Sequence, residues 1–370
     1  MSVLITGATG FLGSRVLRRL LDDGADETIT VLGRGAPGQL RHRIEAVLEA
    51  AQAAPPPPGA LERLRYVESD LTKPGLGLSR RETAEATGGL TAIWHCAAGV
   101  ALQGDPGALF KTNIGGTRAV LELADEAPDA HLFHTSTAYV AGRRRLGHIM
   151  EDDLSEEAGF QTYYEETKFN GERLIHAWAA RTGRAVTIMR PSLLVLDQVI
   201  PDGLPSQSLN PVTRLIDAGL TVTDDAGATL RRDIGTLHIR LRADPEGSLN
   251  MLQVDYAAHA MVRAAAHRGT GVRTIHITHP HNTSMGVLMR AFEHAYPGLV
   301  VEIVTTLPAP TPYEAQVDEQ LTGLAAFTAL RRTYDRTNLL RAVDGLPDPD
   351  PIDSAYLARS MKNADSVVGA

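Results

Sequence analysis

MSVLITGATGFLG, residues 1–13, is the stretch of sequence from which the expected fold follows. Residues 3–6 form a short apolar, partly β-branched run, which is typical of a buried parallel strand. Three glycines follow at regular spacing, and residues 14–21 then carry apolar side chains on one helical face. A strand, a glycine-rich turn and a helix in this order predict a binding site for the diphosphate of a dinucleotide.

Each glycine of this turn has a predicted role. Gly7 allows the tight turn, Gly10 lets the backbone approach the diphosphate, and Gly13 lets the helix pack closely on the strand. The anion would lie at the helix N-terminus, where free N–H groups and the helix dipole favour negative charge. The spacing is G-x-x-G-x-x-G, one residue longer in its first gap than G-x-G-x-x-G. A glycine turn without a ligand is the alternative interpretation.

Composition excludes several classes of function. The chain has 370 residues, and its net charge of −8 leaves no basic footprint, so no nucleic-acid partner is expected. Cys96 is the single cysteine, which excludes a disulfide framework and a cysteine zinc cluster. No apolar run reaches the length of a membrane span, and a first strand at residue 3 leaves no room for a signal peptide. We therefore expect a cytoplasmic protein.

Strand and helix patterns alternate after the glycine turn. Further strands are expected at residues 28–32, 64–68, 91–95, 131–136 and 185–189, and helices at 41–53, 113–127 and 163–181. This alternation predicts an α/β fold of the Rossmann type, with a doubly wound parallel sheet and helices on both faces.

The end of the second expected strand indicates which dinucleotide binds. An NAD-binding fold places an acidic residue there to bind the ribose hydroxyls, but this chain has Arg34, with Arg41 and Arg43 close behind. A guanidinium can bind a 2′-phosphate through two hydrogen bonds. The sequence therefore favours NADPH over NADH, with solvated surface arginines as the alternative.

The pattern becomes irregular after Pro191. Helices are expected at 250–263, 284–295 and 354–361, with a strand at 273–278, and proline-rich loops separate them. We expect an NADP-binding Rossmann domain at residues 1–191 and a smaller, mainly helical substrate-binding region at residues 192–370, interleaved with the sheet.

Tyr164 and Lys168 form the strongest catalytic pattern. They lie four residues apart in an expected helix, so they share one face. An ammonium beside a phenol favours the phenolate and lowers the pKa of the tyrosine, which prepares a proton donor for carbonyl reduction. Tyr163 has no lysine at the matching spacing. The alternative is an exposed pair on a helix surface.

A hydroxyl at the end of the fifth strand would complete such a site. Thr135, Ser136 and Thr137 all lie there, at the sheet edge where ligands bind. A hydroxyl can donate a hydrogen bond to the substrate oxygen as it gains negative charge. Chemistry alone does not separate the three.

Taken together, these motifs resemble the extended short-chain dehydrogenase/reductase family. The resemblance rests on TGATGFLG, Asp70-Leu71, HCAAG, KTNIGGT, STAY, Y-x-x-x-K and Arg190-Pro191, over residues 1 to about 195. It implies that Thr137 is the catalytic hydroxyl, that Tyr164 is the acid/base, and that Lys168 binds the nicotinamide ribose. It implies that Asp70 meets the adenine amino group. Cofactor contacts are implied for Thr6, Gly7, Thr9, Gly10, Phe11, Leu12, Gly13, Arg34, Arg43, Asp70, Leu71, Ala97, Ala98, Asn113, Lys168, Arg190 and Pro191.

Within that family, FHTSTAYVAG (residues 133–142) is similar to the fatty-acyl-CoA reductase and thioester reductase branch. The resemblance implies an NADPH-dependent reductase that converts an acyl thioester to an aldehyde or alcohol. No carrier-protein or adenylation segment lies within these residues, so a free thioester or a carrier supplied by another protein is expected as partner. The sequence leaves the oligomeric state open, with a homodimer as one option.

Two other functions stay open on the sequence. A nucleotide-sugar epimerase, dehydratase or ketone reductase would keep the fold, and Arg231-Arg232 could serve a nucleotide diphosphate. A non-catalytic NADP-binding sensor is the third hypothesis, although sensors that keep this fold typically lose Y-x-x-x-K. His276, His279 and His281 form H-x-x-H-x-H, but no nearby acid or cysteine completes a metal site, so a loop is expected.

Overall fold

The computed structural model describes residues 2–23, 27–50, 55–101, 105–201, 203–207, 209–223, 229–231 and 236–361. Its centre is a parallel sheet with the strand order β14-β7-β5-β4-β1-β2-β3. The strands are β1 (Ser2–Thr6), β2 (Thr28–Gly33), β3 (Leu64–Glu68), β4 (Leu90–His95), β5 (His131–Thr135), β7 (Val186–Pro191) and β14 (Val272–Ile277). The order reverses between β1 and β4, and open α/β sheets bind ligands at such a point.

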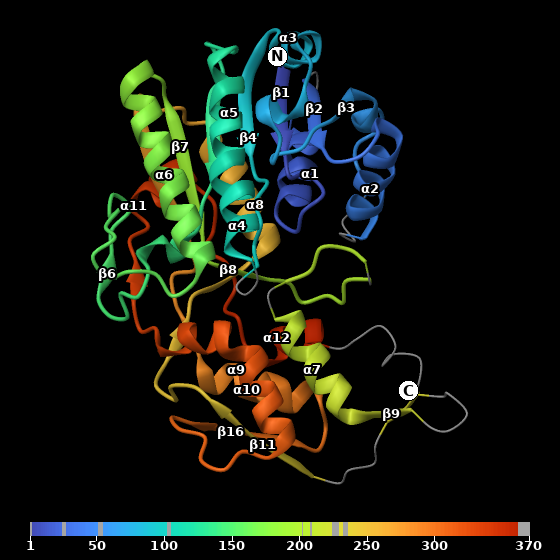
Figure 1. Ribbon diagram of the computed structural model, residues 1–370, viewed down its shortest axis with the longest axis vertical. Coiled ribbons are helices and arrows are strands. Elements are labelled where there is room, and N and C mark those ends of the chain that lie inside the picture. The colour runs from blue at the N-terminus through green and yellow to red at the C-terminus, as the bar shows by residue number, and fades with distance from the viewer. Residues whose placement is uncertain are drawn as a thin grey trace.

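Helices cover both faces of this sheet (Figure 1). One face packs against α1 (Gly13–Asp23), α2 (Pro37–Ala50), α8 (Val254–Ala265) and α11 (Thr337–Ala342). The other packs against α3 (Arg80–Thr87), α5 (Gly116–Asp125) and α6 (Tyr163–Thr182). The expected Rossmann-type α/β class is therefore confirmed.

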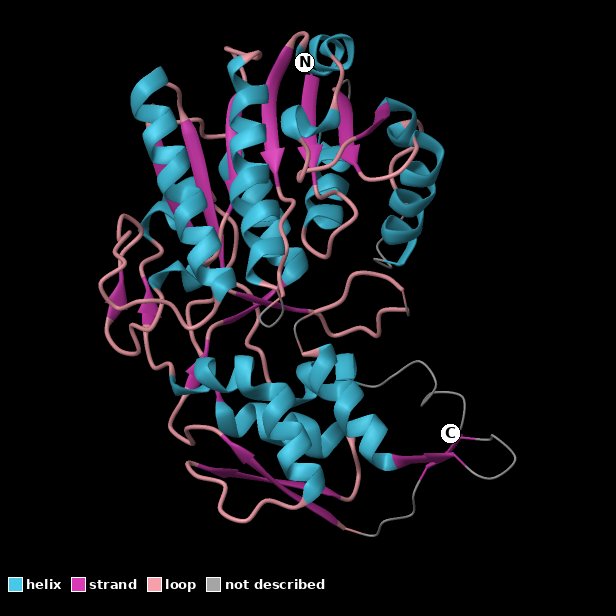
Figure 2. Cartoon of the chain, in the orientation of Figure 1, coloured by secondary structure: helices cyan, strands magenta, loops and turns pink. Residues whose placement is uncertain are grey.

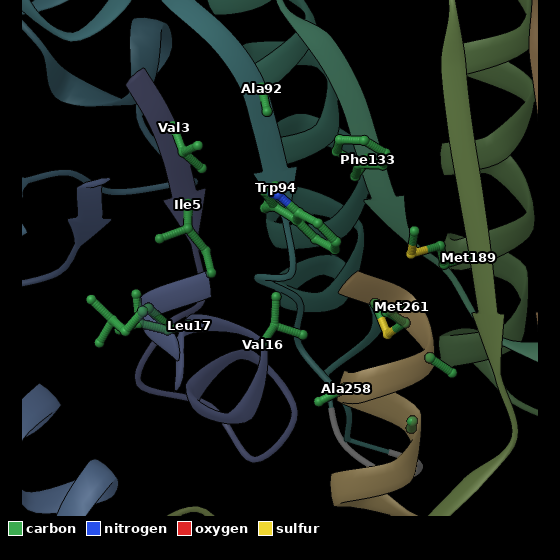
Figure 3. Packing of buried hydrophobic residues seen from close by; sticks show 14 of the residues in the cluster. Val3, Ile5, Val16, Leu17, Ala92, Trp94, Phe133, Met189, Ala258 and Met261 are labelled. Carbon is green, nitrogen blue, oxygen red and sulfur yellow. The ribbon is translucent and has the colours of Figure 1, made fainter. Parts of the chain in front are cut away.

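The alternation of side chains along β1 shows why the sheet is buried on both faces. Val3 and Ile5 point to the face of α1, where they pack in one cluster with Val16 and Leu17 (Figure 3). Leu4, between them, belongs to the cluster on the opposite face. Successive residues of a strand face opposite sides, so a strand covered on both sides needs a continuous apolar run.

A second region lies below the carboxyl edge of the sheet in the view of Figure 2. It contains a two-stranded parallel sheet with helices against it. Its elements are α7 (Asn210–Leu220), β9 (Thr221–Thr223), β10 (Thr229–Arg231), β11 (Leu237–Arg242), α9 (Met285–Ala295), β16 (Leu299–Val304), α10 (Pro312–Ala325) and α12 (Ser354–Met361).

The remaining elements are short strand pairs and short helices. The pairs are β8 (Leu193–Val195) with β13 (Met251–Gln253), β6 (His148–Ile149) with β17 (Thr333–Tyr334), and β12 (Ser248–Leu249) with β15 (Thr283–Ser284). The short helices are η1 (Ala60–Arg63), η2 (Pro74–Gly77), α4 (Pro106–Phe110), η3 (Lys111–Gly115), η4 (Ala138–Ala141) and η5 (Ala326–Ala329). The chain after residue 191 also returns to the main sheet, because β14, α8 and α11 belong to that layer.

Several expected helix boundaries differ from the structure. The helix expected at 41–53 begins at Pro37, and residues 51–53 lie outside the described residues. Two further differences have a visible cause. The helix expected from residue 113 is preceded by α4, because Asp105 accepts hydrogen bonds from the N–H groups of Gly107 and Ala108 and so starts a helix earlier. The helix expected from residue 250 begins at Val254 instead, because the residues of β13 pair with β8.

Candidate active site

The candidate site is a cavity of about 510 Å³ between the carboxyl edge of the main sheet and the second region. On the sheet side it is lined by Gly7, Gly10, Phe11, Leu12, Gly13, Cys96, Ala98, Thr135, Ser136, Thr137, Tyr164, Lys168 and Pro191. The structure thus brings the glycine turn and the expected catalytic residues to one place, as parallel strands ending at a common edge require.

The glycine turn is closed by contacts that a side chain would block. Gly7 has a φ of 75°, and a Cβ there would lie 2.5 Å from the backbone nitrogen of Ala97. A Cβ on Gly13 would lie 2.1 Å from the carbonyl oxygen of Gly7. Thr6, just below, accepts a hydrogen bond from the N–H of Ala97 at 3.3 Å, so the first and fourth strands end in register. This turn fits the close backbone approach that a diphosphate needs.

Helix α6 carries Tyr164 and Lys168 to the cavity. Thr162 and Glu165 form a capping box at its start, which fixes the position of the first turn. The side chains of Tyr164 and Thr137 both line the cavity, and their interaction opposes the rise of the Tyr164 pKa that burial causes. Lys168 is buried and donates from Nζ to the carbonyl oxygen of Thr135 at 2.7 Å. The tyrosine and lysine therefore flank the end of β5.

The three hydroxyls at the end of β5 have different partners. Thr135 donates to the sulfur of Cys96 at 3.4 Å, and Ser136 donates to the carboxylate of Glu172. Thr137 donates to the carbonyl oxygen of Pro191 at 3.4 Å, and it is the one of the three that affects the pKa of Tyr164. The geometry therefore separates hydroxyls that residue chemistry alone left equivalent.

The expected lowering of the Tyr164 pKa is not found. Burial raises the pKa of Tyr164 to about 12, against a smaller opposite effect of the Thr137 hydrogen bond. Burial also lowers the pKa of Lys168 to about 8. The sequence argument counted the charge of the ammonium but not the desolvation of both groups, which disfavours each charged form.

Arg190, expected to contact the cofactor, lies in a buried ion pair instead. Its guanidinium contacts the Glu172 carboxylate at 2.7 Å, and both side chains are at most 1% exposed. The Glu172 carboxylate also accepts from Ser136, which connects the pair to the end of β5. The structure gives the Arg190 side chain this structural role, because it has no surface left for a ligand.

Other expected cofactor residues are not among those that line the cavity. Asn113 is buried; its side-chain amide donates to the Gly99 carbonyl and to the Thr167 hydroxyl, and its oxygen accepts from the Gly99 N–H. It thus fixes the loop after β4 against α6. Asp70 accepts from the N–H and hydroxyl of Thr72, which lowers its pKa. The remaining ones are Leu71, which packs beside Gly116, and Thr9 and Ala97 in the turns after β1 and β4.

A separate hollow lies at the end of β2. It is lined by Arg34, Gly35, Gly38, Gln39, His42 and Arg43. Arg43 donates from its guanidinium to the carbonyl oxygen of Arg34. The hollow thus contains two of the three arginines that the sequence analysis considered for a 2′-phosphate, Arg34 and Arg43.

The side of the cavity formed by the second region is mostly apolar. It is lined by Leu193, Leu209, Val212, Leu241, Leu249, Met285, Leu288, Met289, Phe292, Leu321 and Phe327, with Arg240, Arg242 and Asp318 also present. Sequence reasoning missed these residues. The one available signal was the spacing of Met285, Leu288, Met289 and Phe292, which places them on one face of α9.

The remaining sequence hypotheses concern histidines and arginines. His276 bonds through Nδ1 to the Asp335 carbonyl, and His279 through Nδ1 accepts from the N–H of His281. Among the residues that the structure describes, no three metal-binding side chains gather. The Arg231-Arg232 hypothesis falls outside the side chains that are described. A search of the described helices for one that could cross a membrane finds none.

Comparison with known proteins places this site in a family. Residues 5–261 match the family described as "Male sterility protein", whose model is named for NAD binding. The large subunit of L-2-aminoadipate reductase from Penicillium chrysogenum is 30% identical over 314 residues, which cover 78% of this chain and 20% of that protein. Human fatty acyl-CoA reductase 2 is 32% identical over 156 residues, which cover 40% of this chain and 30% of that protein. The chain thus spans less than a third of either relative.

Solved structures share the fold. The terminal R domain of the myxalamid PKS-NRPS pathway superposes with a TM-score of 0.76 at 22% identity, covering 99% of this chain and 90% of that one. UDP-glucose 4-epimerase from Bifidobacterium longum, in complex with NAD⁺ and UDP, gives 0.65 at 16% identity, with full coverage of both chains. Because the family match covers residues 5–261, well over half of the sequence, the chain belongs to the family described as "Male sterility protein".

Proposed function

We propose that the chain is an NADPH-dependent reductase of an acyl thioester, giving an aldehyde or alcohol. The observation that carries this proposal is the continuity of one cavity, which joins the glycine turn, the Thr137 and Tyr164 hydroxyls and an apolar chamber. A nicotinamide cofactor at the turn would supply the hydride, and an acyl chain would lie in the chamber. The reductases among the relatives named above support the same reaction class.

The residues at the end of β5 would act on the carbonyl oxygen. The hydroxyls of Thr137 and Tyr164, which both line the cavity, would donate hydrogen bonds to that oxygen as it gains negative charge. Tyr164 would then transfer its proton to it, giving a hemithioacetal that collapses to an aldehyde and a thiol. A pKa of about 12 keeps Tyr164 protonated at neutral pH, so it is a donor in the resting protein.

Lys168 would orient the cofactor rather than activate Tyr164 directly. Its Nζ is held by the Thr135 carbonyl within the same cavity, where an ammonium can hydrogen-bond to ribose hydroxyls. The preference for NADPH would come from Arg34 and Arg43, whose hollow is suited to a 2′-phosphate. The thioester would be presented on coenzyme A or on a carrier protein; a solved neighbour is a thiolation-reductase di-domain from an archaeal non-ribosomal peptide synthetase.

The test is cofactor oxidation against a panel of substrates. The purified chain is mixed with NADPH or NADH and with acyl-CoAs, carrier-bound acyl groups, free aldehydes or nucleotide sugars, and products are identified by mass spectrometry. We expect oxidation of NADPH with apolar acyl thioesters and formation of the matching aldehyde or alcohol. Turnover with nucleotide sugars alone would overturn the proposal in favour of an epimerase-type activity. NADPH binding without any turnover would favour the sensor.

A further inference from the structure

Among the residues that the structure describes, two arginines are only 1% exposed, and their guanidinium groups have different partners. Arg190 has a carboxylate partner in Glu172. Arg332 forms no ion pair within the part of the chain that the structure describes; its Nη1 and Nε donate hydrogen bonds, whereas its buried Nη2 has no partner there. Burying a guanidinium costs several kcal/mol unless its donors are satisfied, so the groups that it binds indicate what it is for.

Those groups belong to the segment that follows the catalytic hydroxyl. Arg332 donates from Nη1 to the carbonyl oxygens of Gly142 at 2.7 Å and Arg144 at 2.9 Å. Its Nε donates to the hydroxyl of Tyr334 at 2.8 Å. Thr137 is the cap of the short helix η4, which ends in the turn at Gly142. Arg332 therefore holds the far end of the helix whose near end is Thr137.

The same guanidinium also interacts with Tyr139, whose backbone contacts Thr137. It lies 5.7 Å from the centroid of the Tyr139 ring, at cation–π distance, and Tyr139 donates from its N–H to the Thr137 hydroxyl at 3.3 Å. The Tyr139 ring packs edge-on against Phe327, which lines the apolar part of the cavity. One buried side chain thus connects the cavity wall of the second region with the residue that meets Tyr164.

Arg332 also acts electrostatically on the start of α6. Glu165 follows Tyr164, its side chain is buried, and one of its carboxylate oxygens has no hydrogen-bond partner among the described residues. Burial raises the pKa of Glu165 to about 7, and the positive charge of Arg332 opposes that rise. Both segments that supply the catalytic hydroxyls are therefore tied to this arginine.

We propose that Arg332 is a positioning residue, which holds η4 so that the Thr137 hydroxyl meets Tyr164 and the substrate oxygen. The proposal rests on the function proposed above for that hydroxyl pair. Positioning errors of about 1 Å can cost about 100-fold in rate, so the loss of this anchor should reduce turnover rather than cofactor binding.

The variants of choice are Arg332→Lys and Arg332→Met, with Arg331→Met as matched control. Arg331 is the neighbouring residue, but its exposed guanidinium pairs with Asp244 instead of reaching η4. Main-chain hydrogen bonds from Arg331, Thr333 and Asp335 to residues 145–149 remain in all variants, so the segment should still fold. Tyr334→Phe is a milder change that removes one acceptor of Arg332 and keeps its charge.

Three readouts are combined: kcat and KM, the Kd for NADPH, and hydrogen exchange of the peptide that contains residues 137–144. For Arg332→Met we expect kcat to fall at least about tenfold, KM and Kd to change less than about threefold, and exchange to rise in that peptide. The kcat and the exchange of Arg332→Lys should lie between those of Arg332→Met and wild type, while Arg331→Met should match wild type in both. An unchanged kcat in folded Arg332 variants would overturn the proposal, as would unchanged exchange in the peptide.

Failure of the proposed function gives a different pattern. Aldehyde reduction is measured beside thioester reduction, because both need the Thr137 and Tyr164 hydroxyls. If the wild-type protein reduces only aldehydes, the proposal of a thioester substrate is wrong. The effect of the Arg332 variants can then still be measured as kcat for the aldehyde. If wild type reduces neither, hydrogen exchange alone decides whether Arg332 holds the segment. If both Arg332 variants fail to fold, Tyr334→Phe decides. It must then show a smaller fall in kcat and a smaller rise in exchange of residues 137–144, and wild-type values would overturn the proposal.

Discussion

The two walls of the cavity are built in different ways. The sheet-side wall comes from short segments that each follow a strand: residues 7–13 after β1, 96–98 after β4 and 135–137 at the end of β5. The wall of the second region comes from segments far apart in the chain, in α7, β11, α9 and α10. Backbone geometry determines the first wall, whereas side-chain packing between distant elements determines the second. Substrate-binding surfaces of this kind can therefore change without affecting the cofactor site.

The largest expected effect tests the sheet-side wall. Tyr164→Phe removes the proposed proton donor but keeps the ring, so kcat should fall about 100- to 10,000-fold with little change in NADPH affinity. Tyr163→Phe is the matched control, because Tyr163 is the preceding residue and is 52% exposed. Steady-state kinetics with the best thioester give both values. If Tyr164→Phe kept wild-type turnover, the hydroxyl pair would not be the catalytic centre.

The second prediction tests the opposite wall. Met289→Trp adds bulk on the face of α9 that lines the cavity. If it displaces about three methylenes of an acyl chain, at about 0.8 kcal/mol each, kcat/KM for a long acyl thioester should fall about 50-fold. A thioester with a very short acyl group should be reduced at the wild-type rate.

The exposed methionine Met150 provides the control for this change. Met150 is 43% exposed and is not among the residues that line the cavity, so Met150→Trp should leave both substrates unaffected. Equal losses with long and short substrates in Met289→Trp would contradict the acyl-chain assignment. They would indicate that the second wall supports the fold rather than substrate selection.

The same contrast explains what the sequence could predict. The strand at residues 64–68 and the helix at 354–361 have the expected bounds, because their patterns are local. The glycine turn and the Tyr164–Lys168 face were also predicted from spacing alone. The ion pair of Arg190 with Glu172 and the contacts of Arg332 were not, since each joins residues that lie far apart or on separate elements. The predicted lowering of the Tyr164 pKa was wrong for the same reason, because burial is a property of the folded chain.

The third prediction concerns cofactor choice at the end of β2. Arg34→Ala removes one proposed partner of a 2′-phosphate, and a charge-assisted hydrogen bond of about 1.5–3 kcal/mol corresponds to a rise of about 10- to 100-fold in the KM for NADPH. The KM for NADH should change less than about twofold. Arg41→Ala is the control, because Arg41 is exposed on α2 and pairs with Glu45. A parallel loss with both cofactors would show that Arg34 does not distinguish them.

The last prediction is a pH dependence that comes from Lys168 and is expected to be small near neutral pH. Burial lowers its pKa from 10.5 to about 8, and a lysine carries its charge only below its pKa. If the ammonium orients the cofactor, wild-type kcat/KM should be constant below pH 8 and fall about tenfold for each unit above it. Lys168→Arg keeps a positive charge across this range, so its lower activity should not fall between pH 8 and 10.

Measurement of kcat/KM from pH 6 to 10 separates this effect from a general alkaline loss of activity. Lys111→Arg changes an exposed lysine outside the cavity and should keep the wild-type profile. A wild-type profile that stays flat to pH 10 would show that the charge of Lys168 is not needed. The sheet-side wall would then act through the Thr137 and Tyr164 hydroxyls alone, and the lysine would serve mainly to hold the end of β5 through the Thr135 carbonyl.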